Sequence, residues 1–421
     1  MIVKNARLII KGNETKIQDI LIKKDKIISI ADFIEHEGEE VIDAEERLVL
    51  PGGVDVHVHL REPGFTKKET IKTGSIAAAR GGYTTIMAMP NIIPYPDNVE
   101  MIKKYQELIR KDALVKVLPY ACITKQEEGL EVVDMKAISK LGIAWFSDDG
   151  VGLQQDNIME EAMKKAKTID AMIVAHTEDM NYRKPMACIH DGVRAEELGL
   201  LGIPSICEYK QIERDLQLAL KTNVKYHICH MSAKESICLL RKYKALGANV
   251  SGEVTTHHLL LNENNVENTN HKMNPPLRSE EDRQALIEGL LDGTIDFIAN
   301  DHAPHSEVEK DTTMEKAPFG IVALETSIPL IYTKFVKTGI FTLEQFQDYI
   351  SRKPAKRFGL KNIGELKEGF QADIIILSED EQQIHKETFI SKGKNTPFDG
   401  YRVNGNIVVT LVNGIVVYNA S

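Results

Sequence analysis

The chain has 421 residues, of which 43% are hydrophobic and 27% are charged. This length predicts one large domain with a smaller one beside it, and the composition allows a sizeable buried core. The formal net charge of −10 disfavours strongly anionic partners, so we expect neither nucleic acid nor a membrane surface as a ligand. The overall charge does not exclude a pocket that is locally positive.

The cysteines and the first residues indicate the compartment. The five cysteines form no C-x-x-C pair and their number is odd, which is typical of reduced thiols in a cytosolic chain. The opening stretch MIVKNARLIIKGNETK carries charges throughout. No segment reaches the roughly 18 apolar residues that a membrane helix requires. We therefore expect no signal peptide, no membrane span and a cytoplasmic location.

Short β-prone runs occur at both ends of the chain. They lie at residues 6–12, 19–30, 45–50, 371–377, 406–414 and 414–419. The pair Asn413-Gly414 between apolar runs indicates a hairpin. We expect the two ends, residues 1–50 and 363–421, to form one small β-sandwich domain together.

The middle of the chain, residues 51–362, alternates between strand and helix candidates. The eight strand candidates are residues 54–60, 84–91, 115–123, 143–149, 171–178, 224–232, 249–258 and 295–302. The segments between them carry apolar residues at three- and four-residue spacing, as residues 157–169 do. Eight such repeats predict a (β/α)8 TIM barrel. A doubly wound open sheet is the alternative, but no glycine fingerprint of the dinucleotide type follows the first strand.

Residues of the metal-ligand type stand where these strand candidates end. They are His57, His59, Asp148, Asp149, His176, His230 and Asp301. In a TIM barrel the carboxyl ends of the strands converge on the active site. Imidazole and carboxylate suit zinc. Because only one of the adjacent Asp148 and Asp149 can point inward, six ligands remain, which are too many for one tetrahedral zinc with an open position. The set instead fits two metals about 3.5–4 Å apart that share a carboxylate.

The first strand candidate contains His57 and His59, with Arg61 two residues beyond. Side chains at i, i+2 and i+4 share one face of a strand, so we expect these three together and the valines on the other face. A lone histidine or aspartate at a strand end is usually a hydrogen-bonded structural group. The joint pattern favours a metal, because burying so many charges without one would be costly.

Some choices remain open at this stage. Asp148 and Asp149 are adjacent, so only one of them can point inward, and the spacing does not say which. His227 precedes His230 by three residues, so we expect it to face the other side of its strand. We interpret His257 and His258, which end the seventh strand candidate, as structural or as supporting the ligands.

Several motifs resemble those of the class I dihydroorotases of the amidohydrolase superfamily. In chain order they are DVHVHLREPG, AMPN, FSDDG, VAHTE, CHMS, KMNPPLR, DHAPH and APFG, spread over roughly residues 47–377. The resemblance implies reversible, zinc-dependent cyclisation of N-carbamoyl-L-aspartate to (S)-dihydroorotate in de novo pyrimidine biosynthesis. It leaves open a homodimer and an association with aspartate transcarbamoylase.

The resemblance also implies roles for individual residues. One Zn2+ is expected on His57, His59 and Asp301, and a second on His176 and His230, with Asp149 and a hydroxide as bridges. Asp301 is expected to act as base and then as acid. The expected substrate contacts are Arg61, Asn91, Asn274, His305, Phe319 and Gly320.

Two rival functions are compatible with parts of the sequence. One is another cyclic-amide hydrolase, of the allantoinase or dihydropyrimidinase type, but its substrates lack a carboxylate at the place where Arg61 would bind one. A noncatalytic scaffold would be expected to lose metal ligands, whereas all six are present here.

Overall fold

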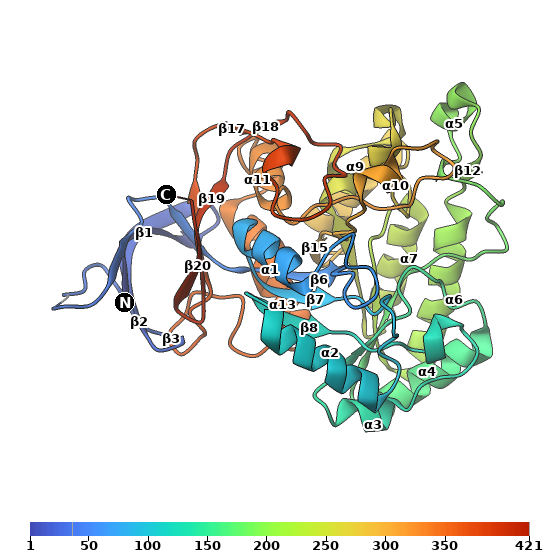
Figure 1. The fold of residues 1–421 in the computed structure, drawn as a ribbon, viewed down its shortest axis with the longest axis horizontal. Coiled ribbons are helices and arrows are strands. Elements are labelled where there is room, and N and C mark those ends of the chain that lie inside the picture. Colours follow the sequence, from blue (N-terminus) through green and yellow to red (C-terminus); the bar gives the residue numbers. More distant parts are fainter. Residues whose placement is uncertain (36, 421) are drawn as a thin grey trace.

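The computed structural model describes residues 1–35 and 37–420, and its largest part is a barrel of parallel strands (Figure 1). The barrel strands are β6 (Gly53–Val58), β7 (Tyr83–Ala88), β8 (Lys116–Pro119), β9 (Trp145–Phe146), β10 (Met172–Ala175), β13 (Lys225–Ile228), β14 (Val250–Thr255) and β15 (Phe297–Ala299). Neighbours pair in parallel, and single bridges from Ala121 to Phe146 and from Val58 to His302 join the two strand groups. The predicted TIM barrel is confirmed.

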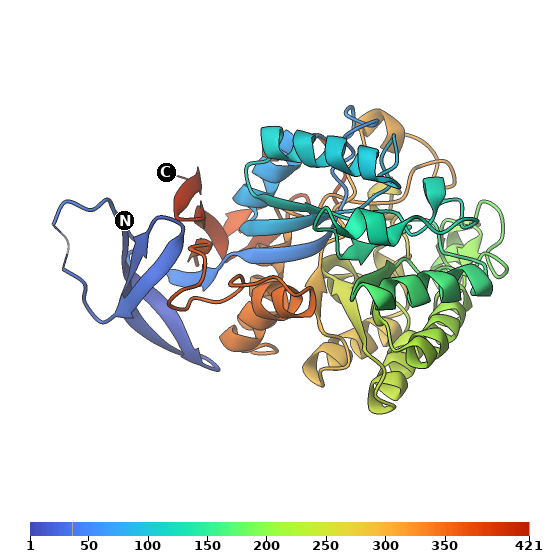
Figure 2. The same ribbon diagram turned by 90° about the horizontal axis from the view of Figure 1, so that it is seen from below.

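Helices cover the outside of the barrel (Figure 2). The longer ones are α1 (Ile71–Arg80), α2 (Val99–Asp112), α4 (Asp156–Thr168), α6 (Ile206–Thr222), α7 (Lys234–Ala245) and α9 (Glu280–Leu291). Short helices are α3 (Met135–Ser139), α5 (Val193–Leu198), α8 (Thr256–Leu260), α10 (Glu307–Lys310), α11 (Ser327–Ile331), α12 (Leu343–Gln347) and α13 (Lys353–Arg357). Capping boxes at Thr70 and Ser279 start α1 and α9 by satisfying their first free N–H groups.

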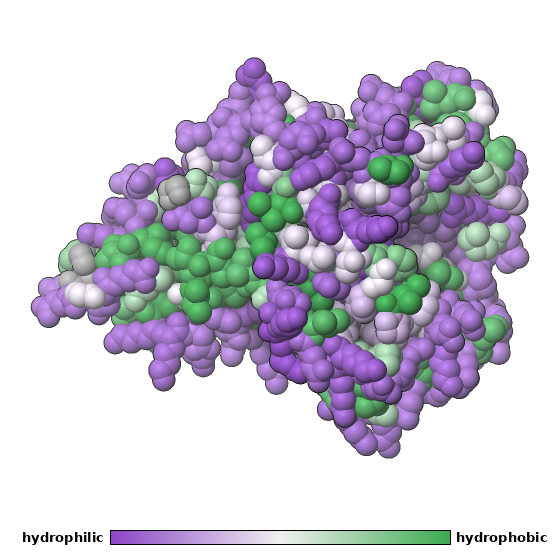
Figure 3. All heavy atoms as spheres, viewed as in Figure 1, coloured by the Kyte–Doolittle hydropathy of each residue, from purple (hydrophilic) through white to green (hydrophobic). Residues whose placement is uncertain are grey.

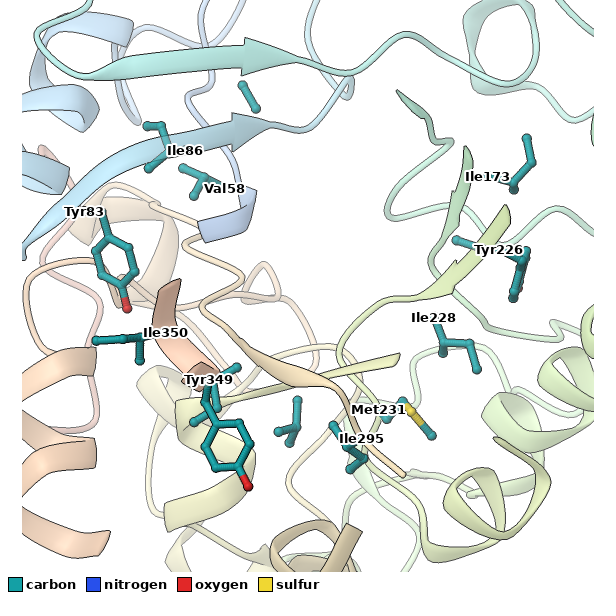
Figure 4. Packing of buried hydrophobic residues seen from close by; sticks show 14 of the residues in the cluster. Val58, Tyr83, Ile86, Ile173, Tyr226, Ile228, Met231, Ile295, Tyr349 and Ile350 are labelled. Carbon is teal, nitrogen blue, oxygen red and sulfur yellow. The ribbon is translucent and has the colours of Figure 1, made fainter. Parts of the chain in front are cut away.

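Alternate residues of the barrel strands pack inward and outward. Ile86, Ile173 and Ile228 belong to the large cluster between strands and helices (Figure 4). Met87 and Val174 belong to a second cluster that fills the barrel interior. Each layer is apolar because parallel barrel strands are buried on both faces.

Strand β6 departs from this alternation. Val54 and Val56 lie in the inner cluster, whereas Val58 lies in the outer one. The pairing of β6 with β7 shifts register between Asp55 and Val58, which inserts an extra residue as a β-bulge does. The prediction that all valines face away from the histidines is therefore wrong for Val54 and Val56, and the bulge changes the direction of the side chains at the end of the strand.

The two chain ends meet in a second sheet. It contains β1 (Ile2–Lys11), β2 (Glu14–Lys23), β3 (Lys26–Ala31), β4 (Val41–Asp43), β5 (Leu48–Pro51), β16 (Ile374–Ser378), β19 (Asn406–Val412) and β20 (Ile415–Asn419). Antiparallel pairing of β5 with β16 joins the N-terminal strands to the C-terminal ones. A small β domain built from both ends is confirmed. Its eight strands belong to one hydrogen-bonded sheet, and the sandwich arrangement expected for it stays a prediction. Figure 3 shows hydrophobic residues gathered on one face of this part.

Part of the C-terminal region returns to the barrel. Residues 379–405 include the short strands β17 (Gln382–Gln383) and β18 (Arg402–Val403), which lie near α11 in Figure 1. Phe389 and Phe398 of this segment pack in one cluster with Ile321 and Val322. The domain boundaries at residues 50/51 and 362/363 stay a prediction. In the part of the chain that the structure describes, every helix is too short or too polar to span a bilayer.

Candidate active site

Six predicted ligand side chains meet at the carboxyl ends of the barrel strands. They are His57, His59, Asp149, His176, His230 and Asp301, and each is at most 7% exposed. The Asp301 carboxylate lies 3.0 Å from His59 Nε2 and 3.5 Å from His57 Nε2. His176 Nδ1 and His230 Nε2 face each other at 3.0 Å. The structure therefore brings together, from five strands, the set that the sequence predicted.

Asp149 lies at the centre of this group. Its carboxylate oxygens are 3.4 Å from both His57 Nε2 and His59 Nε2. Asp149 Oδ1 is also 3.9 Å from His230 Nε2 and 4.0 Å from His176 Nδ1. An oxygen pair placed between two pairs of imidazoles has the arrangement that a shared ligand requires.

The buried donors of this group fit a metal. Two of them, His57 Nε2 and Asp149 Oδ1, are shielded from solvent and have no hydrogen-bond partner. Unpaired buried polar atoms are rare because each loses its hydration without compensation. Nitrogen and oxygen atoms of His57, His59 and Asp301, and of His57, Asp149 and His230, lie within 4.8 Å of one another. The residue types and their spacing are those of a group that can hold a metal ion.

Hydrogen bonds fix the histidine tautomers that metal binding needs. His57 Nδ1 lies 2.8 Å from Glu253 Oε1, and His59 Nδ1 lies 2.8 Å from Asn91 Oδ1. Both partners are acceptors in these contacts, so the Nδ1–H of each ring donates and each Nε2 faces the centre. Asn91, expected to contact the substrate, thus also orients His59.

Asp148 is turned away from the centre. Its Oδ1 accepts hydrogen bonds from the backbone N–H groups of Ile123 at 2.7 Å and Thr124 at 3.1 Å, and the Thr124 hydroxyl donates to its Oδ2. The choice that the strand spacing left open falls on Asp149 as the inward carboxylate, in line with what the family resemblance implied. Asp148 instead joins the ends of β8 and β9.

His227 lies inside the barrel rather than on the opposite side of its strand. Its ring stacks on Phe297 of the inner cluster at 5.2 Å, and its Nε2 lies 3.0 Å from Glu253 Oε2. The alternation argument failed because the strand ends at Ile228 and His230 has a positive φ of 31°. Glu253 consequently links His227 to His57.

Histidines 257 and 258 are buried beside the centre. His258 is hydrogen-bonded through Nδ1 to the Thr255 hydroxyl at 2.7 Å and through Nε2 to the Pro275 carbonyl at 3.0 Å. It is thus a structural group, as expected. His257 has no hydrogen-bond partner at either ring nitrogen, and burial lowers its pKa. Its ring stays neutral and packs 4.5 Å from that of His258.

A pocket of about 280 Å3 opens directly over the ligands. Its lining includes every residue expected to contact the substrate, namely Arg61, Asn91, Asn274, His305, Phe319 and Gly320. Arg61 has no salt-bridge partner in the described part of the chain. Its Nε donates to Pro304 O at 3.3 Å, and its Nη2 lies 3.4 Å from His305 Nε2. The pocket therefore contains a guanidinium group that forms no salt bridge with an Asp or Glu side chain of the described residues.

His305 is held as a neutral ring beside Arg61. Burial and the charges of Arg61 and Lys68 lower its pKa to about 2. Its Nε2–H donates to the Phe319 carbonyl at 2.8 Å, and its Nδ1 lies 3.4 Å from Lys68 Nζ. At Gly320 φ is 122°, and a Cβ there would come within 2.5 Å of Ala303 Cβ, so only glycine fits.

The carboxylates of the centre are ionised. Burial raises the pKa of Asp301. The neighbouring His57 and His59 lower it by a larger amount, so the pKa lies well below its ordinary value. The pKa of Asp149 is also lowered, because the effect of His57 and His59 exceeds that of burial. Both groups are available as anions at neutral pH.

Sequence reasoning missed three charged residues of the site. Glu253 holds His57, Glu178 contacts Asn274 Nδ2 at 2.9 Å, and Arg183 pairs with Glu178 at 2.7 Å. Arg183 also lines the pocket and lies over the Phe319 ring at 5.0 Å. Glu178 stands two residues after His176, which is a usable signal. Nothing in the local sequence marks Glu253 or Arg183.

Comparison with known proteins decides the family. A family model described as Dihydro-orotase-like matches residues 46–236. A curated dihydroorotase from Bacillus pumilus is 52% identical over 420 residues, covering 99% of this chain and 98% of its own length. The chain belongs to the dihydroorotase family. A dihydroorotase from Staphylococcus aureus is likewise 52% identical over 421 residues, covering 99% of both chains. The predicted family is confirmed.

Solved structures place the dihydroorotase-family fold among cyclic-amide hydrolases. An L-hydantoinase (dihydropyrimidinase) from Arthrobacter aurescens has a TM-score of 0.88 at 27% identity, covering 99% of this chain and 96% of its own. A dihydropyrimidinase from Brevibacillus agri has a TM-score of 0.86 at 22% identity, covering 99% and 95%, which shows the shared fold.

Proposed function

We propose that the protein is a dihydroorotase, an enzyme that reversibly cyclises N-carbamoyl-L-aspartate to (S)-dihydroorotate and water. Arg61 carries this proposal, because its unneutralised guanidinium lines the pocket above the ligands. A planar fork of donors suits a carboxylate, and dihydroorotate has one beside its ring amide. The 52% identity to dihydroorotases over the full length supports the same substrate.

The proposed cofactor is a pair of zinc ions. His57, His59 and Asp301 would hold one ion, His176 and His230 the other, and Asp149 would be shared between them. When bound, the ions would acidify a water molecule toward a pKa of ~7 and would polarise the amide carbonyl. The tautomers fixed by Glu253 and Asn91 support this assignment.

The remaining chemistry falls to the chain's own residues. Asp301 is ionised and lies next to His59, so it can accept the proton of the attacking water. In hydrolysis a C–O bond forms, the ring C–N bond breaks, and Asp301 returns that proton to the leaving nitrogen. In cyclisation the same carboxylate removes a proton from the nitrogen and passes it to the departing oxygen. Arg61 holds the free carboxylate in place throughout, and His305 lies beside it in the pocket.

The substrate assay separates this function from its rivals. Purified protein should hydrolyse dihydroorotate far faster than allantoin or dihydrouracil, whose rings lack that carboxylate. Faster turnover of either rival would reassign the enzyme within the cyclic-amide hydrolases. A zinc content near zero in protein purified without chelator would favour the scaffold interpretation.

The pathway and the cellular location follow from the proposed reaction. The reaction belongs to de novo pyrimidine biosynthesis, and we propose the cytoplasm as its location. The free cysteines support this, since all five are unpaired. A homodimer and an association with aspartate transcarbamoylase stay predictions, which size measurements with and without that enzyme would test.

A further inference from the structure

One buried amide outside the predicted site contacts the pocket from a distant part of the chain. Asn395 lies in the C-terminal segment that returns to the barrel, and it is 3% exposed. It comes ninety residues after His305 in the sequence. Neither its residue type nor its surroundings in the sequence mark it as part of an active site.

The Asn395 side chain joins two loops that line the pocket. Its Oδ1 accepts a hydrogen bond from the backbone N–H of His305 at 3.0 Å. Its Nδ2 donates to the carbonyl oxygens of Gly320 at 3.0 Å and Ala303 at 3.2 Å. His305, Gly320 and Ala303 all line the pocket. Both amide protons and one oxygen lone pair of Asn395 thus form hydrogen bonds to pocket-lining residues.

The segment that carries Asn395 is itself firmly held. The hydroxyl of Ser391 donates to the buried carboxylate of Glu69, and the Lys392 N–H donates to the same group at 3.3 Å. A Cβ at Gly393 would lie 2.8 Å from Pro304 Cβ, so the backbone approaches the loop as closely as glycine permits. The backbone that carries Asn395 is therefore held in place by contacts with Glu69 and Pro304.

We propose that Asn395 is a positioning residue that sets the substrate-carboxylate end of the pocket. It holds His305 and Gly320 in place relative to Arg61, and it contacts none of the six metal ligands. The inference rests on the proposed function, because it assigns Asn395 to the carboxylate of dihydroorotate. Loss of its hydrogen bonds frees the two loops to move apart, and a shift of about 1 Å can cost up to about a hundredfold in rate.

Asn404 offers a matched control in the same segment. It is also buried, at 7% exposure. Its Nδ2 donates to Glu379 O at 2.8 Å and its Oδ1 accepts from Lys337 Nζ at 2.9 Å. It does not line the pocket. Asn404→Ala thus removes a comparable buried amide without touching the substrate loops.

The test compares wild type, Asn395→Ala, Asn395→Asp and Asn404→Ala. For each, kcat and KM for dihydroorotate, zinc content and melting temperature are measured. Asn395→Asp keeps the shape and the acceptor for His305 but loses both donors, so it serves if the alanine variant does not fold. We expect both Asn395 variants to raise KM about ten- to a hundredfold with zinc content unchanged. Asn404→Ala should lower the melting temperature and leave KM unchanged.

Two results would overturn the inference while leaving the proposed function intact. One is a wild-type KM in a folded Asn395 variant. The other is an equal rise in KM for Asn404→Ala and Asn395→Ala, which would show general destabilisation. If wild type itself does not hydrolyse dihydroorotate, the proposed function is wrong, and the assignment of Asn395 to that substrate fails with it.

Discussion

Asp148 and Asp149 are neighbours in the sequence, yet their carboxylates serve different parts of the molecule. Asp148 accepts backbone hydrogen bonds from Ile123 and Thr124, whereas Asp149 lies within 4.0 Å of four imidazoles. This pair gives a direct test of the proposed centre, because one substitution type at two adjacent positions should have separate effects.

We expect Asp149→Asn to lose most bound zinc and most activity, since an amide is a weaker ligand and cannot bridge as an anion. Asp148→Asn should keep its zinc and lose stability by about 1–3 kcal/mol, because buried N–H groups lose a charged acceptor. Zinc analysis and denaturant unfolding of both variants measure this. Equal zinc in the two variants would remove Asp149 from the centre.

Asp301→Asn should retain zinc and lose activity. The amide oxygen can still bind a metal, but the side chain can no longer carry the proton between oxygen and nitrogen. General acid–base groups typically contribute about 10²–10⁴-fold to the rate, and we expect a loss of kcat in that range. Steady-state hydrolysis of dihydroorotate with parallel metal analysis is the measurement. Turnover near wild type would assign the proton transfer to another group.

Arg61→Ala should weaken substrate use without removing zinc. Loss of a charge-assisted contact costs about 1.5–3 kcal/mol, which corresponds to at least about ten- to a hundredfold in kcat/KM. Arg61→Lys keeps the charge but loses the planar fork, so it should recover only part of the activity. If the alanine variant lost zinc, Arg61 would support the metal. Full kcat/KM for dihydroorotate would contradict the carboxylate assignment.

Glu253→Gln should weaken metal binding, because Glu253 orients the proposed ligand His57. Glu253 orients His57 at 2.8 Å and His227 at 3.0 Å. Removing a partner of this kind typically costs about 10–100-fold in metal affinity, which competition with a chelator measures. Asp148→Asn serves as the control, because it removes the charge of another buried carboxylate near the site. Unchanged affinity would limit Glu253 to a packing role.

Glu253 should make the stability of the metal-free protein sensitive to acid. Burial raises the pKa of Glu253, but hydrogen bonds from His227 and His57 outweigh it and lower the pKa from 4.5 to about 2. A carboxyl group with a depressed pKa stabilises the fold above its unfolded pKa, and this stability is lost as pH falls from about 4.5 toward 2. The free energy of unfolding of the metal-free wild type should therefore fall more steeply in this range than that of Glu253→Gln. Parallel curves would contradict the shift.

The sequence by itself determined the fold class and the residue types of the site. Strand–helix alternation is a local pattern, and eight repeats leave few architectures that bury every strand on both faces. Because ligands in such a barrel follow the strands, His57, His59, His176, His230 and Asp301 could be assigned from their places alone. The family motifs then added Arg61 and the other pocket residues.

Only the tertiary structure decided where individual side chains point and which distant residues join them. At strand ends the two-residue alternation breaks, through the bulge in β6 and the positive φ values of His230 and Asp301. The inward position of His227 could not be read from alternation, and Asp148 is turned away from the centre by its hydrogen bonds to Ile123 and Thr124. Glu253 and Asn395 came from elements far away in the chain, because hydrogen bonds between remote segments depend on packing that no local pattern records.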